Sequence, residues 1–436
     1  MDLAYAAALP PAEFKVRRQR LFEQMQPGSA LLIFSAIEQR RNQDCCFPFR
    51  QESHFWYLTG FNEPHAALLL VKSAEQNKTV VFLRPRDPMM ETWNGRRLGV
   101  ENATAKLNVD EAYAINEFPS IFSKITQNLT ALYYAPELQS WGQSLFTQSA
   151  VNFTEVFDWQ PILSEMRLFK SANEIRLMQQ AAQISAFGHI KAMQHIRPNR
   201  FEYEIESEIL YEFHRFGARY PAYNTIVAGG ENACILHYTE NDQVLKDGEL
   251  VLIDAGCEFA MYAGDITRTV PINGRFSTAQ RQIYALVLKA QKCAIERLVV
   301  GNSIKNANEE VIRLLVNGLI ELGISQGKAD EFIAREAYRR FYMHGLGHWL
   351  GLDVHDAGDY GQQRDRPLEV GMVLTVEPGL YIPSDKDIPE AYRGIGVRIE
   401  DNLLITEYGN KILTAAAPKE IDEIENLMNS ENFLKM

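Results

Sequence analysis

The order of apolar and polar residues in the first third of the chain predicts a small mixed α/β unit. Residues 11–25 combine apolar positions at helical spacing with charged residues, which is the pattern of an amphipathic helix. Short apolar runs at 30–34, 66–71 and 79–83 have the length of buried strands. We therefore expect an N-terminal α/β domain over residues 1–170.

A different organisation begins after this region. Ser171 and Glu174 form a capping box, in which each side chain satisfies a free amide at the start of a helix, and the helix runs to about His195. Further helical patterns cover 201–216, 277–298 and 303–323. Strands and helices are segregated here rather than strictly alternating, so an α+β domain is expected over residues 171–436.

Two acidic residues stand at the ends of apolar runs in this second part. Asp254 ends one run and Asp265 immediately precedes another. If the runs pair as an antiparallel hairpin that turns near Phe259 and Ala260, the two carboxylates stand opposite each other, with Cβ atoms about 5 Å apart. Buried carboxylates side by side repel each other unless a cation neutralises them. This spacing therefore favours a cation site.

Two further acids and a group of histidines extend this pattern. Glu377 and Glu400 each end another apolar run, and three histidines fall within a glycine-rich stretch at 344–355. Carboxylates with an imidazole form a ligand set for divalent ions, and a pair of such ions can activate water for hydrolysis. The sequence therefore predicts a metal-dependent hydrolase. Its candidate ligands are Asp254, Asp265, His348, Glu377 and Glu400.

The glycine-rich stretch does not fit a zincin. That motif requires H-E-x-x-H on a helix, but Gly345 stands where the glutamate should be, and neighbouring glycines disfavour a regular helix. We expect His348 to bind metal, and His344 and His355 to line the substrate site. His237 is a further candidate, for which a structural role is equally open at this point.

Composition narrows the classes of partner and location. The chain has 436 residues, and 46% of them are hydrophobic. Its net charge of −12 argues against nucleic acid or an anionic membrane as a partner. No apolar run reaches the length of about 18 residues typical of a membrane span, and no secretion signal is expected. Five cysteines without a C-x-x-C pair fit reduced thiols, so we expect a cytoplasmic protein.

The motifs resemble those of the pita-bread metallopeptidases, and specifically the aminopeptidase P (Xaa-Pro aminopeptidase) family. The similar segments are LIDAGCEFAMYAGDITRT, HGLGHWLGLDVHD, VLTVEPGLY and GVRIEDNLLIT. The likeness extends to residues 50–64 and 219–227 in the earlier part of the chain. It implies a pita-bread catalytic domain of the α+β class, preceded by a smaller α/β domain.

The resemblance also implies a ligand assignment for two divalent metal ions, with Mn²⁺ as the first choice. Asp265 and Glu400 are expected to bridge both ions. Asp254 completes the coordination of one ion, and His348 and Glu377 that of the other. A hydroxide between the two ions would attack the scissile carbonyl. The expected substrates are peptides with proline in the second position.

Residues around the ligands receive roles from the same resemblance. Glu377 is expected to move the proton from water to the leaving nitrogen. His355, with His237, would hydrogen-bond the carbonyl oxygen, and His344 would lie beside the proline. Arg398 is expected to orient a ligating carboxylate.

Several alternatives stay open. A prolidase, which cleaves Xaa-Pro dipeptides, uses the same fold. A methionine aminopeptidase fits less well because it needs no N-terminal domain of this kind. A non-catalytic peptide-binding module and a metal-free creatinase-like hydrolase are disfavoured because all five ligand positions are filled. We expect a homo-oligomer, dimer or tetramer, in which the segment around Trp93 either borders a neighbour's active site or is an ordinary aromatic segment.

Overall fold

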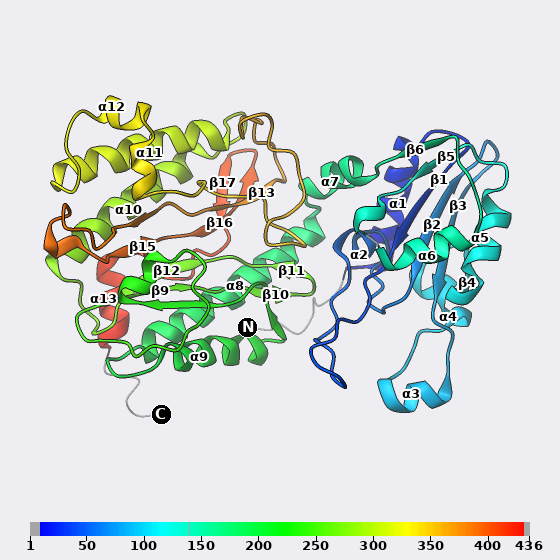
Figure 1. Ribbon diagram of the computed structural model, residues 1–436, viewed down its shortest axis with the longest axis horizontal. Helices are drawn as coiled ribbons and strands as arrows, with labels where there is room; N and C mark the ends of the chain where they lie inside the picture. The colour runs from blue at the N-terminus through cyan, green and yellow to red at the C-terminus, as the bar shows by residue number, and fades with distance from the viewer. Residues whose placement is uncertain (1–8, 139, 431–436) are drawn as a thin grey trace. The chain divides into compact units, whose positions relative to one another are not determined.

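The chain forms two compact units, one ending at Arg167 and the other beginning at Leu168 (Figure 1). The computed structural model describes residues 9–138 and 140–430. Within these ranges, no helix combines the length and the apolar character needed to cross a membrane.

A six-stranded sheet forms the frame of the N-terminal unit, with the strand order β4-β3-β2-β1-β5-β6. Its three central strands pair antiparallel, and the outer strands add in parallel. The strands are β1 (Ser29–Phe34), β2 (Ala67–Lys72), β3 (Asn77–Leu83), β4 (Glu111–Ala114), β5 (Ala131–Tyr133) and β6 (Glu155–Phe157). The helices are α1 (Pro11–Gln24), α2 (Ser53–Thr59), α3 (Pro88–Asn94), α4 (Val100–Leu107), α5 (Phe118–Thr126), α6 (Ser140–Gln148) and α7 (Gln160–Leu168).

Aromatic packing joins this sheet to helix α5. Phe82 on β3 and Phe118 on α5 are fully buried, with ring centroids 4.9 Å apart in an edge-to-face arrangement. Phe118 also lies against Phe34 on β1 at 5.4 Å. Each such side chain contributes roughly 1.5–3 kcal/mol through burial of apolar surface. The apolar runs predicted as strands therefore form the core of the unit.

Four small sheets and six helices form the C-terminal unit over its described residues. The sheets have the orders β11-β10-β7, β12-β9-β8, β13-β16-β17 and β14-β15. The strands are β7 (Tyr220–Pro221), β8 (Ile226–Gly229), β9 (Leu250–Asp254), β10 (Cys257–Phe259), β11 (Tyr262–Ala263), β12 (Thr267–Pro271), β13 (Val373–Val376), β14 (Gly379–Tyr381), β15 (Gly396–Arg398), β16 (Asp401–Thr406) and β17 (Gly409–Ile412). The helices are α8 (Ala172–His195), α9 (Glu202–Arg215), α10 (Thr278–Arg297), α11 (Ile304–Glu321), α12 (Ala329–Ala334) and α13 (Ile421–Asn429).

Helix α8 begins at the predicted capping box. The Ser171 hydroxyl accepts a hydrogen bond from the amide of Glu174 at 3.2 Å, and the Glu174 carboxylate accepts one from the amide of Ser171 at 2.8 Å. These two bonds satisfy amides that lack a partner within the helix. The start of the long helix is therefore fixed by a local signal that the sequence alone carries.

The hairpin from β9 to β12 has a different register from the one predicted. Thr267, and not Asp265, lies opposite Asp254, so the expected pairing is wrong by two residues. The turn comes one position later than expected, at Ala260 and Met261, which both adopt the left-handed conformation with φ of 49° and 75°. Two successive left-handed residues match the twist of a tight hairpin, which sets the register of the strands on either side.

Candidate metal centre

The structure brings together the five predicted ligand positions. Ligand atoms of Asp265, His348 and Glu400 lie within 4.8 Å of one another. The His348 Nε2 atom is 3.5 Å from Glu377 Oε1. Asp254, at the end of β9, is close enough for its charge to act on Glu377 and Glu400. The cluster therefore gathers a residue at the end of β9, residues just before β12, just after β13 and just before β16, and His348 from a loop.

His348 presents one ring nitrogen to the acids. Its Nδ1 atom donates a hydrogen bond to the Trp349 carbonyl at 3.0 Å, while Nε2 lies 3.3 Å from Asp265 Oδ2. A hydrogen bond from one nitrogen fixes the tautomer and leaves the other nitrogen as the ligand. The glycine before it is required, because a Cβ atom at Gly347 would lie 2.1 Å from the Thr375 carbonyl oxygen.

Asp254 is the start of a hydrogen-bonded chain. Its carboxylate accepts bonds from the Tyr223 hydroxyl at 2.5 Å and from Arg398 at 2.7 Å. The same guanidinium donates to the Tyr381 hydroxyl at 2.8 Å, and that hydroxyl lies 2.8 Å from His344 Nε2. Arg398 thus joins a candidate ligand to a candidate substrate-site histidine through a single tyrosine.

Hydrogen bonds from strand residues also hold Asp265 and Glu400, which lie just before β12 and β16. The Thr267 hydroxyl donates to Glu400 Oε2 at 2.7 Å. The amide of Asp265 donates to the Asn402 side chain at 3.1 Å, and the Asn402 amide group donates back to the Asp265 carbonyl. Arg268 donates to the Glu400 carbonyl at 2.6 Å. These bonds fix the backbone at Asp265 and both the backbone and the carboxylate of Glu400.

Electrostatics make the cluster a site for cations. Burial, with the charges of the neighbouring carboxylates, raises the pKa of Glu400 well above its usual range. Burial also raises the pKa of Asp254 and Glu377, despite the opposing charges of Arg398 and His348. Carboxylates in such surroundings ionise together when a cation neutralises them. Oxygen donors with one imidazole nitrogen suit divalent ions, so the residues present fit such ions.

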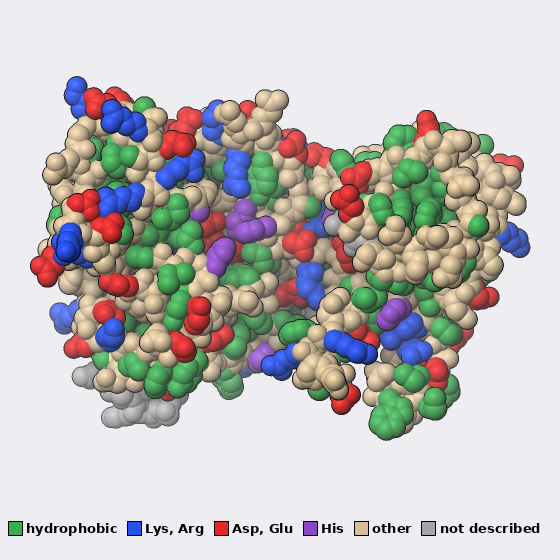
Figure 2. All heavy atoms as spheres, in the orientation of Figure 1, with side chains coloured by type: hydrophobic (Ala, Val, Ile, Leu, Met, Phe, Trp, Pro, Cys, Tyr) green, Lys and Arg blue, Asp and Glu red, His purple; other side chains and the backbone are tan. Residues whose placement is uncertain are grey.

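Three further histidines border this cluster. His344 is mostly buried, and burial with the charge of Arg398 lowers its pKa to about 4. The exposed His355 has its ring centroid 4.2 Å from that of His348. His237 is also exposed and near enough to influence the pKa of both His344 and His355. Figure 2 shows histidine side chains gathered on the visible face of the C-terminal unit.

Several residues that hold the ligands were not predicted from the sequence. Tyr223 and Tyr381 contact the site only through tertiary structure. Thr267, Thr375 and Asn402 carried a usable signal, because each lies two positions from an acidic residue of the cluster. Side chains two apart in a strand point to the same face, so a polar residue at that spacing from an acid is a candidate support for the cluster. Thr375 bonds the acid beside it, whereas Thr267 and Asn402 bond acids of another segment.

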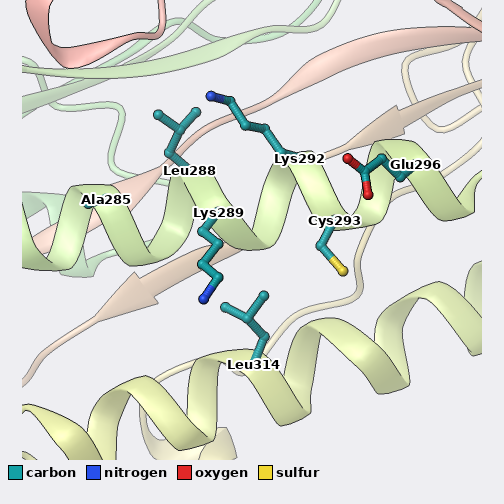
Figure 3. A pocket seen from close by; sticks show the side chains of 7 residues that line it. All are labelled: Ala285, Leu288, Lys289, Lys292, Cys293, Glu296 and Leu314. Carbon is teal, nitrogen blue, oxygen red and sulfur yellow. The ribbon is translucent and has the colours of Figure 1, made fainter.

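A separate groove lies between α10 and α11 (Figure 3). It encloses about 460 Å³, and its lining includes Lys289, Cys293 and Leu314. None of its lining residues belongs to the acidic cluster, and we assign no function to it.

Comparison with known proteins defines the class of the protein. The family model described as Metallopeptidase family M24 matches residues 176–407, and the model described as Aminopeptidase P, N-terminal domain, matches residues 14–133. The chain therefore belongs to metallopeptidase family M24. Membership of this family and the cluster of Asp265, His348 and Glu400 support the use of a divalent metal.

Within that family the chain is similar to aminopeptidase P. It is 70% identical to a Xaa-Pro aminopeptidase of Haemophilus influenzae, over 98% of this chain and 100% of that protein. It is 53% identical to the Xaa-Pro aminopeptidase of Escherichia coli, over 95% and 97%. A solved structure of zinc-substituted E. coli aminopeptidase P in complex with product has a TM-score of 0.95 and 51% identity, over 96% of this chain and 98% of that one. The family and the two-part fold predicted from the motifs are confirmed.

Proposed function

We propose that the chain removes the N-terminal residue from peptides with proline in the second position, using two divalent metal ions. The observation that carries this proposal is the convergence of Asp265, His348 and Glu400 in a chain 70% identical to a Xaa-Pro aminopeptidase. The catalytic domain in this proposal comprises residues 171–436, and residues 1–170 form the N-terminal domain.

The cluster provides the ligands. Asp265 and Glu400 would hold both ions, Asp254 would complete the ligand set of one, and His348 and Glu377 that of the other. Four carboxylates among five ligands favour a hard or borderline ion, so Mn²⁺ is our first choice, with Co²⁺ or Zn²⁺ as substitutes in vitro. When bound, such ions supply Lewis-acid activation of water and of the scissile carbonyl.

Glu377 is the residue that moves the proton. One of its oxygens accepts a hydrogen bond from the Thr375 hydroxyl at 3.2 Å, which limits the rotation of the carboxylate. A carboxylate held in this way can take the proton of the attacking water and pass it to the leaving nitrogen. This transfer is needed because the leaving nitrogen must become an amine when the peptide bond breaks.

The surrounding histidines account for the substrate. A peptide bond to proline has no N–H, so the site needs no acceptor for that nitrogen. His344, held by the Tyr381 hydroxyl at 2.8 Å, forms one side of the space for the proline. His355 and His237 donate hydrogen bonds to the carbonyl oxygen, where negative charge develops in the transition state.

We also propose that the protein is cytoplasmic and forms a dimer or tetramer. Trp93 on α3 is 80% exposed and Met89 on the same helix is 69% exposed. Large apolar side chains exposed together favour a contact surface, and we assign this one to the active-site mouth of a neighbouring copy. Light scattering after size-exclusion chromatography, on wild type and Trp93→Ser, measures the assembly. Wild-type protein that is monomeric would contradict the proposed dimer or tetramer.

A peptide assay tests the activity. The release of the first residue is measured from Xaa-Pro-Xaa tripeptides and from Xaa-Pro dipeptides, with and without added Mn²⁺. Rapid, metal-dependent cleavage of the tripeptides is expected. Cleavage of the dipeptides alone would identify a prolidase instead, and no cleavage by protein that holds two ions would contradict both.

A further inference from the structure

We propose that Lys170 is a positioning residue, whose ion pair with Asp356 fixes the loop that carries His355. The inference rests on the proposed function, in which His355 contacts the carbonyl oxygen of the substrate. Lys170 lies just before α8, 186 positions before Asp356 in the chain. The contact is therefore purely tertiary.

The ion pair is almost completely buried. Lys170 Nζ lies 3.0 Å from Asp356 Oδ2, and each side chain is only 1% exposed. The ammonium group also donates to the Leu168 carbonyl at 3.4 Å, and the Lys170 amide donates to the Gly371 carbonyl at 3.0 Å. An ion removed from water needs a partner to replace its hydration. The position of the Asp356 carboxylate is therefore set by the lysine.

The loop from Trp349 to Asp356 closes on this carboxylate. The Asp356 amide donates to the Trp349 carbonyl at 2.9 Å, and its Oδ1 atom accepts a bond from the Asp353 amide at 3.2 Å. The loop leaves no room at Gly351, where a Cβ atom would lie 2.2 Å from Asp356 Oδ2. The two oxygens of the Asp356 carboxylate thus hold the loop in different ways. Oδ1 binds the Asp353 amide, and Oδ2 pairs with Lys170.

The consequence concerns the two imidazoles at the ends of this loop. His355 immediately precedes Asp356, and its ring centroid lies 4.2 Å from that of His348 in an edge-to-face contact. Without the Lys170 ammonium, the buried Asp356 carboxylate loses the ion pair at 3.0 Å, and the loop shifts to hydrate the charge. His355 then moves with the loop. Misplacement of a catalytic group by about 1 Å can cost ~10²-fold in rate.

The experiment uses Lys170→Met, which keeps the apolar stem and removes the ammonium group. We expect kcat to fall by ~10-fold to ~10²-fold with little change in KM and with both metal ions retained. His355→Ala and the double variant complete a mutant cycle, which measures whether the two residues act together. The double variant should be no slower than His355→Ala alone. Histidine-labelled NMR spectra of the metal-free protein provide a readout independent of activity, with the His355 signal assigned from its absence in His355→Ala.

The matched control is Tyr284→Phe, which removes one buried hydrogen bond, from the hydroxyl to the Lys419 carbonyl at 2.8 Å. It should lower stability without moving the His355 signal or kcat. Losses that multiply in the double variant, or an unshifted His355 signal in Lys170→Met, would overturn the positioning role. If His355→Ala kept its full kcat, the proposed role of His355 would be wrong, and the NMR shift alone would then decide whether Lys170 positions the loop.

Discussion

A buried neutral histidine should make the C-terminal unit sensitive to acid. His189 on α8 is 0% exposed, and its Nε2 atom donates a hydrogen bond to the Ala255 carbonyl at 3.0 Å. Its Nδ1 atom has no partner among the described residues. Burial and the charge of Arg268 lower its pKa from 6.5 to about 3, against the smaller opposing effects of backbone hydrogen bonds to Ala255 and Ile266 and of the Asp401 charge. A second proton would therefore place a positive charge on a fully buried ring.

The size of the effect follows from the difference in proton binding. Above pH 6.5 His189 is neutral in both the folded and the unfolded chain, so the stability is fully present. Between pH 6.5 and 3 the unfolded chain binds a proton that the folded chain does not, and the stability falls by about 1.4 kcal/mol per pH unit. At pH 4.5 the loss is roughly 3 kcal/mol.

The assay compares wild type with His189→Gln, whose amide group can still donate to the Ala255 carbonyl but does not titrate. Urea unfolding of both metal-free proteins is followed by circular dichroism at pH 7.5 and 4.5. All other titrating groups are shared, so their effects cancel in the difference between the two proteins. The variant should gain about 3 kcal/mol relative to wild type on acidification. A relative change below ~1 kcal/mol, which is near the resolution of such measurements, would refute the buried neutral state.

Four further outcomes test the site. Glu400→Ala should lose activity and at least one metal ion together, and elemental analysis that still finds two ions at full occupancy would contradict a bridging role. Glu377→Gln should lower kcat by ~10²-fold or more, provided that both ions remain bound; near-normal turnover with both ions present would exclude the proton-transfer role. Thr267→Val should weaken metal affinity by ~10-fold or more by removing the hydrogen bond to Glu400, with Thr267→Ser as the control that keeps the hydroxyl. His344→Ala should reduce the preference for Xaa-Pro-Xaa over Xaa-Ala-Xaa with the metals in place, and an unchanged ratio of kcat/KM values would make this histidine structural.

Features encoded by neighbouring residues could be predicted from the sequence. The capping box of Ser171 and Glu174 sets the start of α8 because its hydrogen bonds join residues three apart. The register from β9 to β12 could not be predicted in the same way. It depends on the left-handed conformations of Ala260 and Met261, and neither residue type favours that conformation.

The same distinction applies to the candidate site. Acids at the ends of apolar runs, in recognisable motifs, were enough to select the cluster. The bond from Arg398 to Asp254 spans 144 residues, and its geometry depends on how the sheets pack. Tyr223 reaches the same carboxylate from a loop before β8, where nothing in the local pattern marks it. Of the residues that support the cluster, only the polar ones two positions from an acid, such as Asn402, could be predicted from the two-residue repeat of a strand.

The order of the ligands along the chain has a consequence for biosynthesis. The ligand set runs from Asp254 to Glu400, whereas the first unit is complete at Arg167. Domains emerging first from the ribosome can fold while the rest is still being made. The acidic cluster, however, stays incomplete until Glu400 has been synthesised. A chain that stops before Glu400 therefore carries a formed first unit and an unneutralised set of acids. Only a chain that extends past Glu400 gains the stabilisation that metal binding adds to a folded state.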